Sequence, residues 1–172
     1  LGDLHEAKDL KLSSNSDGDQ QKSLDVIADS EYIKALKSSP VAGYVSEEKE
    51  DLIVLNESGS LLLAIDPLDG SSNIGVNVSI GTIFSIYRRR TKPGTSPTIE
   101  DALQTGSQQL ASGYVLYGSS TILVLTTGQG VNAFTYEPSL GEFFLSHTQL
   151  RFPEDGKTYS CNEGNLNQFC DY

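Results

Sequence analysis

An apolar run leads directly into a polar turn in the stretch Leu61-Leu62-Leu63-Ala64-Ile65-Asp66-Pro67-Leu68-Asp69-Gly70-Ser71-Ser72-Asn73. The five apolar residues predict a strand over 61–65. Pro67 disfavours helical backbone at Asp66, while Gly70 and the two serines favour a sharp turn. The stretch therefore predicts a strand that ends in carboxylates and opens onto a turn.

This turn combines groups that suit an anion with groups that suit a cation. Backbone N–H groups in a tight turn and the hydroxyls of Ser71 and Ser72 can bind an anion such as phosphate. Asp66 and Asp69 can reach one hard cation, which prefers oxygen ligands, and Mg²⁺ or Mn²⁺ fits best. The alternative is a plain turn, because Asp, Pro, Gly and Ser are also ordinary turn formers.

A second acidic pair, Glu47-Glu48, follows an apolar segment just as Asp66 does. If the two strand ends are adjacent, four carboxylates come together. Two like charges about 5 Å apart repel by roughly 3 kcal/mol at an effective dielectric constant of about 20. Such a cluster beside a phosphate would need cations that bridge the oxygens, as in two-metal phosphoryl-transfer sites. The alternative is that residues 47–51 form a solvated charged turn.

The remaining pattern predicts an α+β domain. Apolar spacing predicts a helix over 20–38 that ends before Pro40. A half-buried strand is predicted over 76–86 from apolar residues at Val76, Val78, Ile80, Phe84 and Ile86, followed by an exposed loop over 88–99. Further strands are predicted over 41–45, 51–56, 111–117, 121–127, 131–137 and 141–146, the last four as an antiparallel meander.

Composition excludes several classes of protein. A net charge of -11 makes a nucleic-acid backbone an unsuitable partner. No apolar run approaches the roughly 20 residues of a membrane-spanning helix, so we expect a soluble protein. The two cysteines, Cys161 and Cys170, make no disulfide framework, and no secretion signal opens the chain, so we expect a reducing, cytoplasmic location.

The motifs together resemble class I fructose-1,6-bisphosphatase. The turn from Asp66 to Asn73 is shared with the wider lithium-sensitive, inositol-monophosphatase-like phosphatases, and the continuation narrows the resemblance. The matching segments follow the family's order along the chain and are 18–26, 45–48, 78–88, 113–119, 141–143 and 159–164. The resemblance implies a layered α/β/α sandwich with a mostly antiparallel sheet. It also implies that residues 1–172 form the N-terminal metal- and phosphate-binding domain, without the family's C-terminal domain.

The resemblance implies Mg²⁺-dependent hydrolysis of the 1-phosphate of fructose 1,6-bisphosphate, by a phosphoric monoester hydrolase that is a homotetramer at full length. The positions that match metal ligands are Glu47, Glu48, Asp66, Asp69 and the carbonyl of Leu68. Asp25 with Glu48 matches the pair that deprotonates the attacking water, and Asp19 matches an assisting loop residue. Substrate contacts match Asp69, Gly70, Ser71, Ser72 and Asn162.

The chain departs from the resembled family at two positions, and two alternative functions compete with the one that the resemblance implies. Gly75 stands where most members carry Asp, and Asn165 replaces a Tyr that many animal members use toward the distal phosphate. The nearer rival is sedoheptulose-1,7-bisphosphatase or another sugar or inositol phosphatase with the same motif. The more distant rival is a non-catalytic acidic module that binds a divalent cation such as Ca²⁺. Turnover on the different substrates and the preferred cation discriminate among them.

Overall fold

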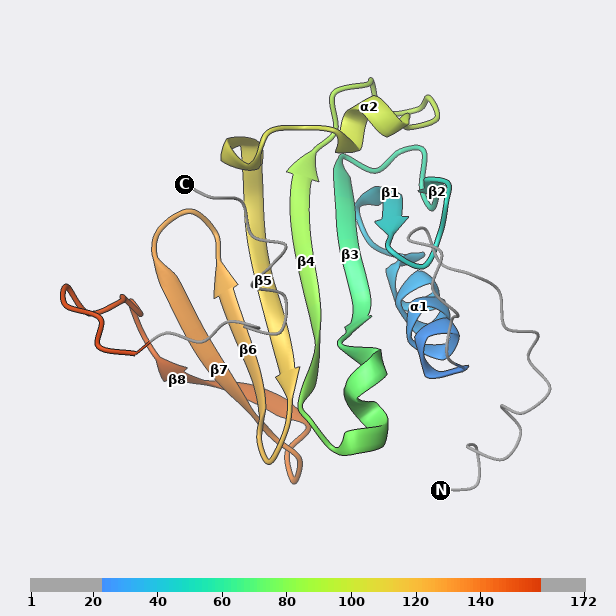
Figure 1. The fold of residues 1–172 in the computed structure, drawn as a ribbon. Helices are drawn as coiled ribbons and strands as arrows, with labels where there is room; N and C mark the ends of the chain where they lie inside the picture. The colour runs from blue at the N-terminus through green and yellow to red at the C-terminus, as the bar shows by residue number, and fades with distance from the viewer. Residues whose placement is uncertain (1–22, 159–172) are drawn as a thin grey trace, which may run out of the picture.

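The computed structural model describes residues 23–158, and eight strands form one sheet (Figure 1). The strands are β1 (Val41–Ser46), β2 (Ile53–Val54), β3 (Leu61–Asp69), β4 (Ile80–Arg88), β5 (Gln109–Tyr117), β6 (Thr121–Thr126), β7 (Val131–Glu137) and β8 (Glu142–His147). Their order is β2-β1-β3-β4-β5-β6-β7-β8. β1 and β3 pair in parallel, and the other neighbours pair antiparallel. The predicted α+β class, mostly antiparallel sheet and C-terminal meander are confirmed.

The helix α1 (Ser23–Leu36) packs on the β1 and β3 end of the sheet. Its side chains Tyr32, Ile33 and Leu36 contact the buried core cluster of Val41, Tyr44, Leu63 and Ile65. This burial removes apolar surface from water and stabilises the helix on the sheet. The helix predicted over 20–38 is confirmed between Ser23 and Leu36, and α1 supplies a helical layer beside the sheet.

The strand predicted over 76–86 is wrong at its beginning. Residues Ser71–Val76 form a 3₁₀ helix, η2, and Asn77 follows in a left-handed conformation with φ 59°. Val76 and Val78 are consequently exposed, at 70% and 55%, and β4 begins only at Ile80. The alternation of apolar residues was real, but a turn interrupts it before the strand starts.

The strand predicted to end at Ile65 continues to Asp69. Its register against β4 is regular up to Asp66, opposite Ile83, and resumes at Asp69, opposite Gly81. The intervening residues form a β-bulge, which is a usual way to redirect side chains near functional sites. Both aspartates therefore belong to the end of β3 rather than to a loop beyond it. The strand predicted over 51–56 is present only as the two-residue β2.

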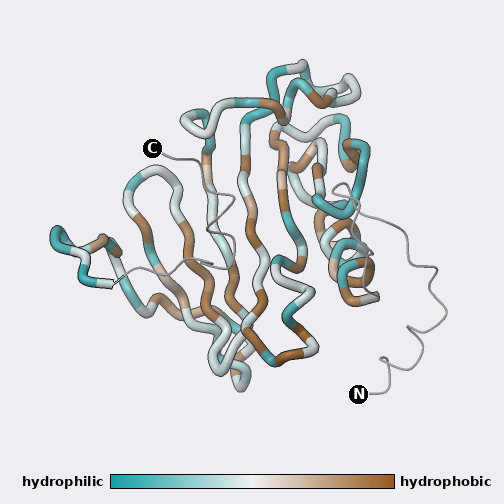
Figure 2. Tube along the Cα trace, in the orientation of Figure 1, coloured by the Kyte–Doolittle hydropathy of each residue, from teal (hydrophilic) through white to brown (hydrophobic). Residues whose placement is uncertain are grey.

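The loop predicted after β4 is present from Arg89 to Thr98, and two short helices, α2 (Ile99–Ala102) and η3 (Gly106–Gln108), follow it. Figure 2 shows apolar residues along the central strands and hydrophilic residues in the connecting loops. Buried side chains concentrate in β1 and β3, whereas β8 exposes Phe144 and Leu145. No helix within residues 23–158 has the length and apolar character that crossing a bilayer requires.

Candidate functional site

The ends of β1 and β3 bring two acidic pairs to one end of the sheet. Ser46 lies opposite Ile65 in the parallel ladder, and the N–H of Glu47 donates to the Ile65 carbonyl at 3.1 Å. The carboxyl ends of parallel neighbours meet at the same edge. Glu47 and Glu48 therefore leave β1 beside the point where Asp66 leaves the regular part of β3. The sequence left this adjacency open as one of two alternatives, and the parallel pairing of β1 with β3 provides it.

Asp66 lies in an environment of like charge. Burial raises the pKa of its carboxyl group above the ordinary value, and the negative charges of Asp69 and Asp25 raise it further. The N–H of Leu68 donates to Asp66 Oδ1 at 3.0 Å and opposes this shift. Asp25 comes from the first turn of α1 and is only 3% exposed. The fold thus brings a third, distant carboxylate close enough to affect the ionisation of Asp66.

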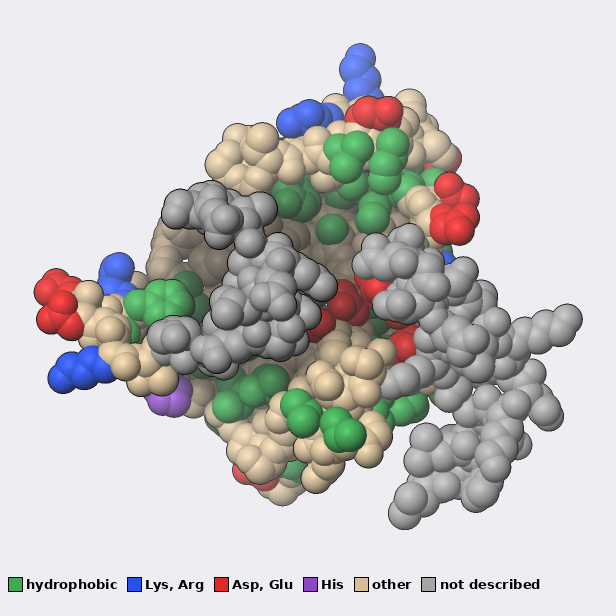
Figure 3. Space-filling model, in the orientation of Figure 1, with side chains coloured by type: hydrophobic (Ala, Val, Ile, Leu, Met, Phe, Trp, Pro, Cys, Tyr) green, Lys and Arg blue, Asp and Glu red, His purple; other side chains and the backbone are tan. Residues whose placement is uncertain are grey.

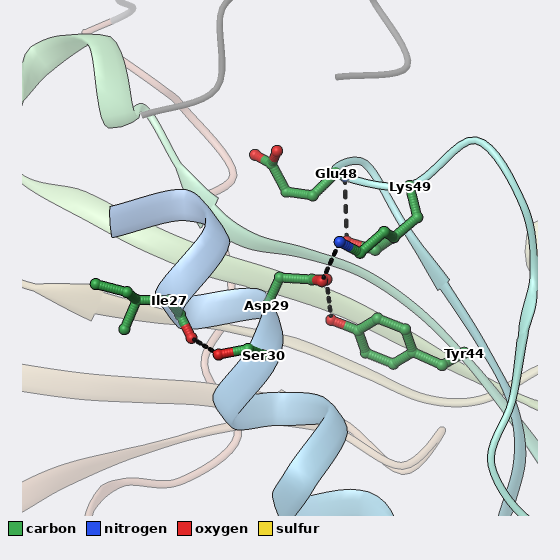
Figure 4. Close-up of polar contacts among 7 residues, drawn as sticks. Ile27, Asp29, Ser30, Tyr44, Glu48 and Lys49 are labelled. Atoms are coloured by element: carbon green, nitrogen blue, oxygen red, sulfur yellow. Dashed lines mark hydrogen bonds and ion pairs between the residues drawn. The ribbon is translucent and has the colours of Figure 1, made fainter. Parts of the chain in front are cut away.

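Glu48 is buried, and an ion pair beside it joins the Glu47-Glu48 turn to α1 (Figure 4). The next residue, Lys49, places its Nζ 3.2 Å from Asp29 Oδ2. The other oxygen of Asp29 accepts a hydrogen bond from the Tyr44 hydroxyl at 2.8 Å. Burial, and then this contact with Asp29, raises the pKa of Tyr44. Because Asp29 is fully buried on α1, this cluster anchors the Glu47-Glu48 turn to the helix that carries Asp25.

The turn after β3 has the left-handed backbone that its glycine permits. Gly70 has φ 79° and ψ 22°, and the N–H of Asn73 donates to its carbonyl at 2.8 Å. Ser71 and Ser72 begin η2 directly after it. A cavity of about 300 Å³ lies between this turn and β4 and β5, lined in part by Asp69, Gly70 and Asn73. A phosphate-sized anion fits a space of this volume.

The donors at this end of the sheet suit a hard divalent cation, because they are carboxylate and carbonyl oxygens. Burial is the main cause of the raised pKa of Asp66, and a bound cation would relieve the repulsion from Asp69 and Asp25 that adds to it. Figure 3 shows acidic side chains gathered near the centre of one face. Within the described residues 23–158, however, no three or more His, Cys, Asp and Glu side chains lie close enough together to hold a metal ion as they are placed. The carboxylates thus lie at the same end of the sheet without forming a complete set of metal ligands.

Not every position named from the sequence lies within the described residues. Asp19 and Asn162 lie outside the described residues, as does Asn165. Gly75 is exposed, and a Cβ atom added there would meet nothing within 4 Å. The backbone therefore leaves room for the Asp that most members of the resembled family carry.

Sequence reasoning missed a buried hydroxyl cluster beneath the bulge. Thr82 of β4 is 1% exposed, and its Oγ1 lies 2.9 Å from the Pro67 carbonyl, 2.9 Å from the Tyr117 hydroxyl and 3.2 Å from the Tyr32 hydroxyl. A signal was present, because Thr82 is the polar residue within the apolar series Ile80, Phe84 and Ile86. Asp29 gave no comparable signal, since charged residues are common on helices.

Comparisons with known proteins agree with this geometry. Residues 5–148 match the family model described as fructose-1-6-bisphosphatase, N-terminal domain. The chain is similar to fructose-1,6-bisphosphatase of Leishmania major in its holo form, with 39% identity and a TM-score of 0.84 over 96% of this chain and 53% of the other. The apo and T-state forms each match with 42% identity and a TM-score of 0.76, over 84% of this chain and 49% and 47% of theirs. The chain thus spans about half the length of these structures.

Proposed function

Because this chain belongs to the fructose-1,6-bisphosphatase family, we propose that the protein hydrolyses the 1-phosphate of fructose 1,6-bisphosphate to fructose 6-phosphate and phosphate. The observation that carries this proposal is the junction of three features at one end of the sheet. These are the parallel pairing of β1 with β3, the bulge that holds Asp66 and Asp69, and the left-handed turn at Gly70. Together they combine cation ligands with an anion-sized space.

The residues that would hold Mg²⁺, or Mn²⁺, are Glu47, Glu48, Asp66, Asp69 and the carbonyl of Leu68. When bound, the cation would neutralise phosphoryl oxygens and assist the leaving alkoxide and the attacking water. Phosphate-monoester hydrolysis needs an acceleration of up to about 10²¹-fold, which no single side chain supplies. A cation site and a positioned base therefore have to act together.

The chain's own residues would position the substrate and move the proton. Asp25 and Glu48 are both buried, so their carboxylates are shielded from bulk water. Such a position suits a general base that takes the proton of the attacking water. Gly70, Ser71 and Ser72 would bind the reacting phosphate through N–H and hydroxyl donors, with exposed Asp69 beside it. Asp19 and Asn162 are proposed to assist the reaction and to contact the far part of the substrate, respectively.

The proposal also covers the whole protein from which this domain comes. Residues 1–172 would be the N-terminal metal- and phosphate-binding domain, and full turnover would need the family's C-terminal domain. A homotetramer and a cytoplasmic location are proposed for the full-length protein. Size-exclusion chromatography with light scattering and cell fractionation test these two points.

The test is phosphate release from fructose 1,6-bisphosphate with and without Mg²⁺, in the full-length protein and in the 172-residue chain. In the full-length protein we expect Mg²⁺-dependent release that Asp66→Asn abolishes and that Asp155→Asn, at an exposed position, preserves. The 172-residue chain alone should release little phosphate, because full turnover would need the C-terminal domain. Parallel assays with sedoheptulose 1,7-bisphosphate and inositol monophosphate identify the substrate class. Release that ignores Mg²⁺, or that survives Asp66→Asn, would overturn the site assignment. Cation binding without turnover by the full-length protein would favour a non-catalytic module.

A further inference from the structure

The peptide unit between Pro67 and Leu68 is held at both ends. Its carbonyl oxygen accepts from Thr82 Oγ1 at 2.9 Å, and its N–H donates to Asp66 Oδ1 at 3.0 Å. Rotation of this peptide would break one hydrogen bond or both. The same unit lies between Asp66 and Leu68, two of the proposed metal ligands. Its orientation therefore determines the direction of the Asp66 carboxylate and of the backbone that carries the Leu68 carbonyl.

Thr82 can hold this peptide only in one arrangement of protons. A threonine hydroxyl has one proton and two lone pairs, whereas a backbone carbonyl can only accept. Since the proton of Thr82 goes to Pro67, the hydroxyls of Tyr32 and Tyr117 must donate to Thr82. All the hydrogen-bonding capacity of the buried Thr82 hydroxyl is then used. Burial, which is only partly offset by the hydrogen bond with Thr82, raises the pKa of Tyr32 to about 12, so this donor keeps its proton at neutral pH.

The three hydroxyls come from separate elements of the fold. Tyr32 belongs to α1, Thr82 to the beginning of β4, and Tyr117 to the end of β5. The cluster thus connects the helix that carries Asp25 to the bulge that carries Asp66. Because Tyr32 comes from α1, the cluster lies on the α1 side of the sheet, and it contacts the bulge through the Pro67 carbonyl rather than through a proposed ligand.

We propose that Thr82, supported by Tyr32 and Tyr117, is a positioning residue that orients the Asp66–Asp69 segment for binding a divalent cation. The inference rests on the proposed function, because it assumes that Asp66 and Leu68 are ligands. Outer groups that orient metal ligands typically contribute about 10- to 100-fold in metal affinity. A role confined to packing would instead change thermal stability and leave the affinity unchanged.

The test measures Mn²⁺ affinity by electron paramagnetic resonance in the full 172-residue chain, together with the melting temperature of each metal-free variant. Thr82→Val removes the hydroxyl at nearly constant shape, and Thr82→Ser keeps it. Thr135→Val, on β7 three strands away, is the matched control. We expect Thr82→Val to weaken Mn²⁺ binding at least about 10-fold, and the other two variants to bind within about two-fold of the wild type.

The remaining outcomes separate this inference from the proposed function. Wild-type affinity in folded Thr82→Val, combined with lost binding in Asp66→Asn, overturns the positioning role and keeps the metal site. Wild-type affinity in Asp66→Asn, or no Mn²⁺ binding by the wild type, overturns the proposed metal site itself. If Thr82→Val does not fold, Tyr32→Phe and Tyr117→Phe each remove one donor to Thr82. Unchanged affinity in both of these variants would also refute the inference.

Discussion

Asp101→Asn is expected to loosen the loop that follows β4. Asp101 is 1% exposed, and its Oδ1 accepts from the N–H groups of Arg90 and Thr91, both at 2.7 Å. Its Oδ2 accepts from the Thr91 hydroxyl at 2.7 Å and from the N–H of Thr98 at 2.9 Å. An asparagine can replace one of these oxygens as an acceptor, but its NH₂ group cannot accept from Thr91 and Thr98. Two donors at a buried position would then lose their partner.

The size of the effect follows from the ionisation of Asp101. Burial alone would raise its pKa, but hydrogen bonds from Thr98, Thr91 and Arg90 outweigh burial and lower the pKa from 3.8 to about 2. At about 1.36 kcal/mol for each pH unit, this difference corresponds to about 2.5 kcal/mol of stability. Because the folded-state pKa is depressed, the contribution is present above pH 3.8 and is lost as the pH falls through about 2.

Urea unfolding of the wild type and of Asp101→Asn between pH 3 and pH 7 provides the assay. At pH 7 we expect the free energy of unfolding to fall by about 2.5 kcal/mol, or the melting temperature by about 5–10 °C. The difference should shrink toward pH 3. Glu154→Gln removes the same charge from an exposed residue outside this loop and should leave stability nearly unchanged. Equal stability of Asp101→Asn and wild type at pH 7, or a difference that does not vary with pH, would refute the reasoning.

The other predictions concern the site and its supports. Gly70→Ala should cost about 1–2 kcal/mol in unfolding free energy, because φ is 79° there, whereas Gly75→Ala should cost little; equal costs in urea titrations would contradict this. Tyr44→Phe should cost about 1–3 kcal/mol, because the buried Asp29 loses a donor; calorimetry that finds no loss would sink the idea. Asp66→Asn should stabilise the metal-free protein at pH 7. Because folding raises the pKa of Asp66, its carboxyl group favours the folded state only while it is protonated, which holds at pH values below its ordinary pKa of 3.8. This contribution is lost as the pH rises, so Asp66→Asn should gain stability at pH 7 and gain none near pH 3. A gain that is the same at both pH values in thermal melts would argue against this cause.

Local sequence patterns predicted a large part of the fold. Apolar runs separated by glycine-containing turns identified β5 to β8, and the spacing before Pro40 identified α1. The pattern failed between residues 76 and 79 because alternation continued through a 3₁₀ helix and the left-handed Asn77. It also ended β3 too early, since a bulge containing Pro67 does not resemble a strand in the sequence.

The sequence by itself determined which groups are available at the site. Apolar segments precede the two acidic pairs, Asp66 with Asp69 and Glu47 with Glu48, and Gly70 can adopt the left-handed backbone that the turn requires. These features depend on neighbours within a few residues, because backbone sterics and side-chain alternation are local. Their chemistry was therefore readable before the structure was known.

Only the tertiary structure decided how these groups are combined and supported. The parallel pairing of β1 with β3 brings the two acidic pairs together, and the packing of α1 adds Asp25. The same packing buries Asp29 and brings Tyr32 to Thr82, whose hydroxyl reaches the bulge from the neighbouring strand β4. These contacts join residues far apart in the chain, and they form because buried polar groups must find partners once water is excluded. No local pattern records which distant partner each group will find.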